Sequence, residues 1–235
     1  MPETTSRPFI RHYDAEKDFA NVVHVFRETC DEALKTEPIW TIGFYIWCRP
    51  YLLLSPATCF VLDNGSGTAV GYIIGTSDSQ RFCASWEREY VPLVKDEITD
   101  LASREVESGD DNGSKLRSRD NLTNLILTNP EDLIYGERKQ MLSPWPGHLH
   151  IDILPSYHRQ GHGKALMTTF LEALEEGCHG VHLGMIASNS VATAFYEANG
   201  FQRLPQVLDG GASGEMGRTE KAKDSVELLY YVKDL

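Results

Sequence analysis

The segment from residue 148 to residue 164 carries the side chains best suited to acid–base chemistry and anion binding. It reads HLHIDILPSYHRQGHGK. Asp152 is a candidate base, because a carboxylate on the polar face of a central strand needs a function or a partner. The sequence leaves open whether Asp152 is instead structural and pairs with His148 or His150. His150 could relay a proton, but these two histidines supply only two ligands, so no metal site is expected.

A strand, a tight turn and a helix are predicted to position these residues. Leu149, Ile151 and Ile153 alternate with the polar residues, which is typical of a pleated strand. Pro155 ends the strand, since proline has no amide proton for a ladder hydrogen bond. Beyond the turn, one apolar helical stripe consists of Leu166, Met167, Phe170, Leu171 and Leu174.

The turn itself contains two glycines, Gly161 and Gly163, directly before the helix. Glycine lets the backbone approach a ligand and adopt dihedral angles closed to other residues. The unpaired amides at a helix start attract anions, and Arg159 and Lys164 add positive charge. The pattern therefore predicts a phosphate cradle. It is neither a Walker motif nor a dinucleotide motif, which would need a third glycine at the position of Leu166.

Two motifs in this order resemble the GNAT superfamily of acetyl-CoA-dependent N-acetyltransferases. Residues 158–163, His-Arg-Gln-Gly-His-Gly, are similar to its Gln/Arg-x-x-Gly-x-Gly/Ala signature, with His158 departing from the usual first residue. After a predicted strand at 181–185, ASNSVATAFYEANGF at 187–201 resembles its Asn-x-x-Ala-x-x-Phe-Tyr helix. Asn189 or Ser188 is expected to cap that helix, and Gly200 to end it.

The resemblance implies an α/β fold. Its mixed central sheet has about seven strands, helices cover both faces, and the fourth and fifth strands splay apart. The acetyl-CoA diphosphate would rest on the turn, and an amide near the strand end would polarise the thioester carbonyl. Tyr196 would protonate the leaving sulfur, and the less favoured alternative is that it only packs against the coenzyme. The expected coenzyme contacts are Ile153, Leu154, Arg159, Gln160, Gly161, His162, Gly163, Lys164, Asn189, Phe195 and Tyr196.

The acceptor side is suggested by an insertion at about 80–145, in what we expect to be one N-acetyltransferase domain over residues 1–235. The insertion follows Gly75-Thr76-Ser77-Asp78 and contains Phe82, Trp86 and Pro92. This resembles glucosamine N-acetyltransferases and the acetyltransferase-like domain of O-GlcNAc hydrolases. It implies an amino sugar such as glucosamine as acceptor, attacked directly in a ternary complex. The expected substrate contacts are Asp78, Trp86, His150 and Asp152.

Alternative functions remain open at this point. The acceptor could be another small amine or a protein amino group, and a catalytically inactive interaction module is a further alternative. A formal net charge of −12 over 235 residues argues against a nucleic-acid partner. The five cysteines are scattered, and no apolar run reaches membrane-helix length, which favours a cytoplasmic protein without a membrane partner. A homodimer stays open.

The rest of the chain is expected to frame this site. Residues 8–13 predict a first strand, and Asp14 a helix cap. Pro50 should divide the aromatic-rich stretch 39–54 into two pieces. Further expected elements are a hairpin of 58–63 and 68–76, a helix at 85–98, a mobile loop at 99–120, a sixth strand at 201–208 and a final strand at 225–232.

Overall fold

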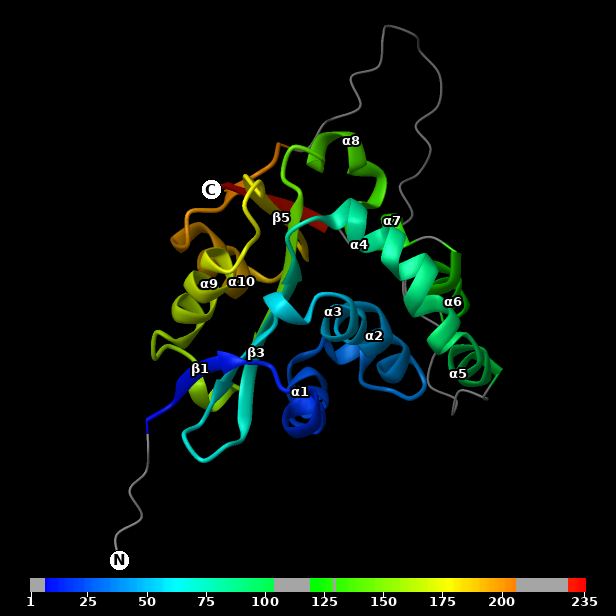
Figure 1. The fold of residues 1–235 in the computed structure, drawn as a ribbon, viewed down its shortest axis with the longest axis horizontal. Helices are drawn as coiled ribbons and strands as arrows, with labels where there is room; N and C mark the ends of the chain where they lie inside the picture. The colour runs from blue at the N-terminus through cyan, green and yellow to red at the C-terminus, as the bar shows by residue number, and fades with distance from the viewer. Residues whose placement is uncertain (1–6, 104–118, 129, 206–227) are drawn as a thin grey trace, which may run out of the picture.

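A seven-stranded mixed sheet in the order β1-β2-β3-β4-β5-β7-β6 organises the protein. The computed structural model describes residues 7–103, 119–128, 130–205 and 228–235 (Figure 1). The strands are β1 Phe9–His12, β2 Phe60–Asp63, β3 Ala69–Thr76, β4 Gly147–Ile153, β5 Gly180–Ile186, β6 Gln202–Arg203 and β7 Leu228–Asp234.

Strand direction divides the sheet into two antiparallel parts joined by one parallel contact. β1, β2, β3 and β4 pair antiparallel, and β7 pairs antiparallel with both β5 and β6. β4 and β5 run parallel, which requires a crossover, and the helix between them supplies it. The α/β class, the mixed sheet and the helices on both faces are thus confirmed.

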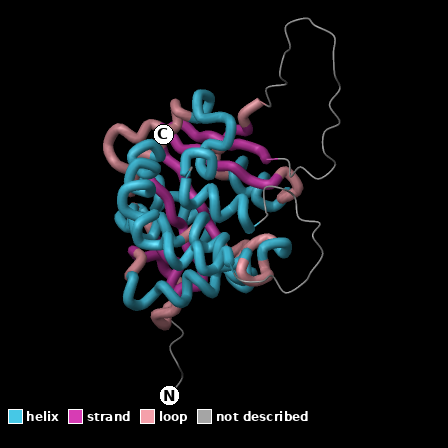
Figure 2. The backbone as a smooth tube through the Cα atoms, turned by 90° about the vertical axis from the view of Figure 1, so that its right-hand side faces the viewer, coloured by secondary structure: helices cyan, strands magenta, loops and turns pink. Residues whose placement is uncertain are grey.

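Helices cover both faces of the sheet. In Figure 1, α9 and α10 lie to the left of the strands and α1 to α6 to the right. Figure 2 shows the second group in front of the strands. The α-helices are α1 Ala15–Thr29, α2 Ile39–Trp47, α3 Arg49–Leu54, α4 Ser79–Ser85, α5 Val91–Ser103, α6 Arg119–Thr128, α7 Pro130–Tyr135, α8 Lys139–Leu142, α9 His162–Glu172 and α10 Ser190–Ala198. Among the described helices, none has the length and apolar character needed to cross a bilayer.

Two apolar cores follow from the alternation of side chains along the strands. Ile73, Leu149 and Ile153 face α9 and α10, where they pack with Leu166 and Phe170. The alternate residues on β3, Tyr72 and Ile74, join the larger core under α1 to α7. The predicted polar face of β4 therefore lies on the side of this larger core, which is why His148 is buried and Asp152 is only partly exposed.

Local signals in the first third of the chain give the expected elements. The Asp14 side chain accepts a hydrogen bond from the Glu16 amide and caps α1. The stretch 39–54 breaks at Cys48, directly before the helical turn that contains Pro50, as predicted. The hairpin is also present, with Tyr72 opposite Val61 and the Asn64 amide closing the turn on the Thr68 carbonyl.

The predicted insertion contains α4 to α8. A π-helical segment, Trp86–Tyr90, joins α4 to α5, so one helical run extends from Ser79 to Ser103. The expectation of a mobile loop at 99–120 is wrong for 99–103, because the buried Leu101 keeps the last turn of α5 on the core, and for 119–120, which begin α6. Residues 104–118 lie outside the described residues.

The end of the chain differs from the prediction in strand length and order. The expected sixth strand shortens to β6, Gln202–Arg203, and residues 206–227 are outside the described part. The final strand begins at Leu228, runs to Asp234 and lies between β5 and β6. Sequence order hides this placement, because β7 pairs with a strand that precedes β6 in the chain.

We expect Trp86→Phe to lower the free energy of unfolding by about 1–3 kcal/mol, because it leaves a buried carbonyl without a donor. The Trp86 indole is buried and donates to the Ile126 carbonyl of α6 at 3.0 Å. Urea unfolding followed by circular dichroism measures the change. Trp145→Phe is the matched control, since its indole donates to Asp234 at a more exposed position. Equal losses in the two variants would contradict the structural role of Trp86.

Candidate functional site

The site begins where β4 and β5 part. Their parallel register contains two pairs, Gly147 with Val181 and His148 with His182, and ends there. The rest of β4 keeps its other edge on β3 as far as Leu154, whose amide donates to the Val70 carbonyl at 2.9 Å. The predicted splay of the fourth and fifth strands is therefore present.

The parting leaves alternate backbone groups of β4 facing a gap. Successive residues in a strand direct their N–H and C=O groups to opposite edges, so Ile153 faces away from β3. The His158 ring lies 2.7 Å from the Ile153 carbonyl oxygen through its Nε2 atom. Two amides are expected near the carbonyl to be polarised. The expectation is wrong for the Leu154 amide, because it already donates to the Val70 carbonyl. The Ile153 amide is directed toward the gap.

The glycine turn presents a row of backbone amides. Arg159 and Gly161 both have positive φ, 57° and 85°, and Gly161 is the N-cap of α9. Within the described part of the chain, the amides of 161–164 have no hydrogen-bond acceptor, and Ala165 pairs with the Gly161 carbonyl. Such a row at a helix start binds anions. The side chains of Arg159 and Lys164 are exposed beside it.

The remaining turn residues have separate tasks. The Gln160 side chain donates to the Ser156 carbonyl, and the half-buried His162 ring lies 6.3 Å from that of Tyr157. A Cβ atom on Gly163 would come within 2.9 Å of the Phe195 ring. Gly163 is therefore needed for the close approach of α9 to α10, whereas Gly161 is needed for its dihedral angle.

Helix α10 brings Asn189 and Tyr196 to the same region. Asn189 Oδ1 accepts from the Ala192 amide, so the predicted cap is confirmed. Tyr196 is buried, and its ring lies 5.3 Å from Phe195 and 6.3 Å from Tyr231. Burial, together with the charge of Asp152, raises the pKa of Tyr196 above its ordinary value. The phenol therefore keeps its proton at neutral pH and can act as an acid.

Asp152 lies on the wall of a cavity of about 410 Å³ on the α1 side of the gap. The apolar part of the wall is formed by Phe26, Leu34, Trp47 and Ile186. The polar part contains Thr29, Asp31, His150, Asp152, Ser188 and Asn189. The wall therefore joins α1, α2, β4 and the start of α10, and two of the predicted site residues, His150 and Asn189, share it with Asp152.

Burial sets the protonation of the two titratable groups of β4. It raises the pKa of Asp152 to about 6, and the hydrogen bond from Tyr72 opposes this rise. Burial lowers the pKa of His150 to about 4. At pH 7 Asp152 is therefore mostly ionised but a useful base, while His150 is neutral. Within the described residues, no group of three or more His, Cys, Asp or Glu side chains is arranged to hold a metal ion.

Two of the predicted substrate contacts are not brought to this cavity. Asp78 caps α4 by accepting from the Arg81 amide at 2.9 Å, and Trp86 lies in the core. Sequence reasoning missed Trp47 and Phe26, which form the apolar wall. The aromatic-rich stretch that contains Trp47 was a signal, but most of its aromatic residues are buried in the core. Composition alone does not distinguish the one that reaches the cavity.

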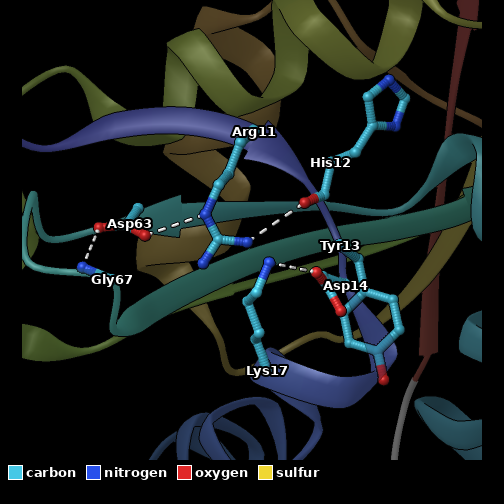
Figure 3. A pocket seen from close by; sticks show the side chains of 7 residues that line it. All are labelled: Arg11, His12, Tyr13, Asp14, Lys17, Asp63 and Gly67. Atoms are coloured by element: carbon cyan, nitrogen blue, oxygen red, sulfur yellow. Dashed lines mark hydrogen bonds and ion pairs between the residues drawn. The ribbon is translucent and has the colours of Figure 1, made fainter.

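A second hollow, of about 470 Å³, lies at the corner of β1 and α1. Figure 3 shows that its charged groups already have partners, with Arg11 directed at Asp63 and Lys17 at Asp14. Arg11 also binds the buried Asp18 through both terminal nitrogens, at 2.6 and 2.8 Å. These ion pairs tie β1 to α1 and β2, and they identify this hollow as a structural corner.

Comparison with known proteins agrees with this geometry. Residues 132–203 match the acetyltransferase (GNAT) domain. The structure of SsHAT is similar, with a TM-score of 0.73 and 28% identity over 97% of this chain and 98% of that chain. The NatC complex bound to Gag peptide and CoA gives a TM-score of 0.50 and 14% identity, over 97% of this chain and 99% of the other.

A further similar fold is that of a GNAT superfamily phosphinothricin acetyltransferase from Sinorhizobium meliloti in complex with AcCoA. Its TM-score is 0.50 and its identity 11%, over 97% of this chain and 88% of that chain. This similarity and that to NatC concern the fold. The sheet, the splay and the matched domain together define the GNAT acetyltransferase fold, and the protein is an acyltransferase of the N-acetyltransferase class.

We expect Asp152→Asn to stabilise the protein by about 1–3 kcal/mol at pH 7.5, because one pKa unit corresponds to about 1.4 kcal/mol. The folded pKa of Asp152 is raised from 3.8 to about 6. Ionisation therefore opposes folding above this range and has no effect below the unfolded pKa. Urea unfolding at pH 7.5 and pH 4 should show the gain at the higher pH only. A loss of stability at pH 7.5 would mean that the carboxylate holds the fold together.

Proposed function

We propose that the protein transfers the acetyl group of acetyl-CoA to the primary amine of a small molecule by direct attack. The observation that supports this proposal is that a candidate base and an anion-binding turn lie close together along the chain. Asp152, whose pKa is about 6, stands at a cavity on one side of the strand gap, and a turn with acceptor-free amides follows the same strand. A base near the end of one strand and an anion cradle in the turn that follows it fit an amine and a phosphate-bearing donor.

The donor would be held by the turn and the gap. The amides of 159–164, with Arg159 and Lys164, would bind the diphosphate, since those of 161–164 have no acceptor within the described residues. The Ile153 amide would bind the thioester carbonyl, and Asn189 and Phe195 would flank the pantetheine arm. Acetyl-CoA would supply an activated acyl group on a thiol leaving group.

The chain's own residues would move the protons. Asp152 takes one proton from the acceptor ammonium, so that the neutral amine attacks the carbonyl carbon. The new C–N bond forms as the C–S bond breaks, and Tyr196 gives its proton to the departing sulfur. The second proton of the nitrogen replaces the one that Tyr196 gave, and Asp152 releases its proton to solvent.

We propose an amino sugar, such as glucosamine, as the most favoured acceptor. The cavity offers the Trp47 ring for the apolar face of a sugar and polar groups for its hydroxyls. Within the described residues its wall includes two aspartates and no lysine or arginine, and His150 is neutral at pH 7. Such a wall favours an ammonium group and disfavours a phosphorylated amine.

Donor binding is the direct test of this function. Isothermal titration with acetyl-CoA should show binding, and Gly161→Ala should weaken it about tenfold, because a Cβ atom disfavours the left-handed conformation that aims the amides. Gly177→Ala is the matched control, since Gly177 also has a positive φ and open space but lies outside the turn. It should lose similar stability and keep its affinity. Absence of binding by the unaltered protein would favour an inactive interaction module.

Acceptor choice and the roles of the two catalytic candidates can be measured together by thiol release. We expect glucosamine to react faster than its 6-phosphate, spermidine or a lysine peptide. Asp152→Asn should then lower kcat at least 10²-fold with unchanged acetyl-CoA affinity, in keeping with general base catalysis. Tyr196→Phe should lower kcat without shifting the acidic limb of the rate–pH profile. Preference for the peptide would point to a protein substrate, and an unchanged rate in Asp152→Asn would make Asp152 structural.

A further inference from the structure

A tyrosine on the neighbouring strand holds the Asp152 carboxylate. Tyr72 and Asp152 are direct partners in the β3–β4 register. The Tyr72 hydroxyl donates to Asp152 Oδ2 at 2.5 Å. Tyr72 is fully buried, whereas Asp152 is partly exposed on the cavity wall. Side chains directly opposite on antiparallel strands share one face of the sheet, so the backbone itself fixes this contact.

Other neighbours are poorer donors to this carboxylate. The Thr29 hydroxyl lies 2.7 Å from the Val25 carbonyl of its own helix, and a hydroxyl has one proton to donate. Cys48 is a buried thiol, and thiols are weak donors. A hydrogen bond from Thr29 also lowers the pKa of Asp152, but less than the one from Tyr72. The phenol of Tyr72 is therefore the stronger donor, and it fixes Oδ2 of the carboxylate.

We propose that Tyr72 is the positioning residue for the catalytic base, which holds Asp152 Oδ2 through its hydroxyl and turns Oδ1 toward the acceptor amine. This inference rests on the proposed function, because it takes Asp152 as the base. Nothing in the sequence pattern of β3 distinguishes Tyr72 from a core tyrosine. The assignment comes from the strand register and from the hydroxyl–carboxylate contact.

The same hydrogen bond favours the ionised form of Asp152. A donor to a carboxylate stabilises the charge and opposes the desolvation that raises its pKa. Other groups near the carboxylate come from α1 and the loop after it, the α2–α3 junction, β4, the turn after β4, and α10. They are Thr29, Cys30, Asp31, Cys48, His150, His158 and Tyr196. Tyr72→Phe leaves all of them in place, so a change in titration reports the lost hydroxyl.

The test is the pH dependence of kcat in Tyr72→Phe with the best acceptor of the panel. We expect the acidic limb to move up by about one to two pH units, since a hydrogen bond to a charged group has about that effect. At pH 7 the rate should fall about two- to tenfold, and it should recover near pH 9 because the base is then ionised again. Acetyl-CoA affinity should not change.

Two controls separate this role from a loss of packing. Tyr90→Phe also removes a buried phenol, which donates to the Tyr45 carbonyl at 2.7 Å away from the cavity. It should lower stability without moving the acidic limb. In an Asp152→Asn background, Tyr72→Phe should have no further effect on the rate–pH profile, because the coupling needs the carboxylate.

A direct titration distinguishes failure of this inference from failure of the proposed function. The carboxyl carbon of Asp152 can be followed by NMR in protein with 13C-labelled aspartate and assigned by its loss in Asp152→Asn. An unchanged Asp152 titration in Tyr72→Phe would overturn the positioning role. A raised pKa that leaves the acidic limb of the rate in place would instead show that Asp152 is not the base.

Discussion

The early end of the β4–β5 ladder is the constraint on which the rest of the structure depends. Two strands can part without loss of order only if each keeps a partner at its other edge. β4 is held by β3 over six registered pairs, and β5 by β7 over seven. The backbone groups that the parting leaves unpaired are thus presented by two well-supported strands. Insertion of β7 between β5 and β6 is what makes this possible, because it gives β5 an antiparallel neighbour at the edge opposite β4.

Removal from water then gives different roles to groups that would otherwise titrate at ordinary values. Burial raises the pKa of Asp152 to about 6 and raises the pKa of Tyr196 above its ordinary value. It lowers the pKa of His150 to about 4. Near neutral pH one group can accept a proton, one can donate, and the third is uncharged. A single cause, desolvation, therefore separates a group that can accept a proton from one that can donate it.

The sequence predicts most of the fold, because its signals are local. The Asp14 and Asn189 caps, the hairpin turn and the break before Pro50 each depend on a few neighbouring residues. The position of β7 and the helical continuation through Leu101 depend on contacts between distant segments, which periodicity does not report. For the same reason the sequence indicates Asp152 and the glycine turn as site residues, but it misplaces Asp78 and Trp86. The sequence also gives no sign that the Leu154 amide donates a hydrogen bond to the Val70 carbonyl.

Gly163 and Phe195 give the site one further property. The ring of Phe195 fills the space that a side chain at position 163 would need, so α9 and α10 approach closely at this point. The next residue on α10 is Tyr196, and the amides at the start of α9 flank Gly163. A larger residue at position 163, or a changed ring at position 195, would therefore disturb the packing of the two helices that carry the glycine turn and Tyr196.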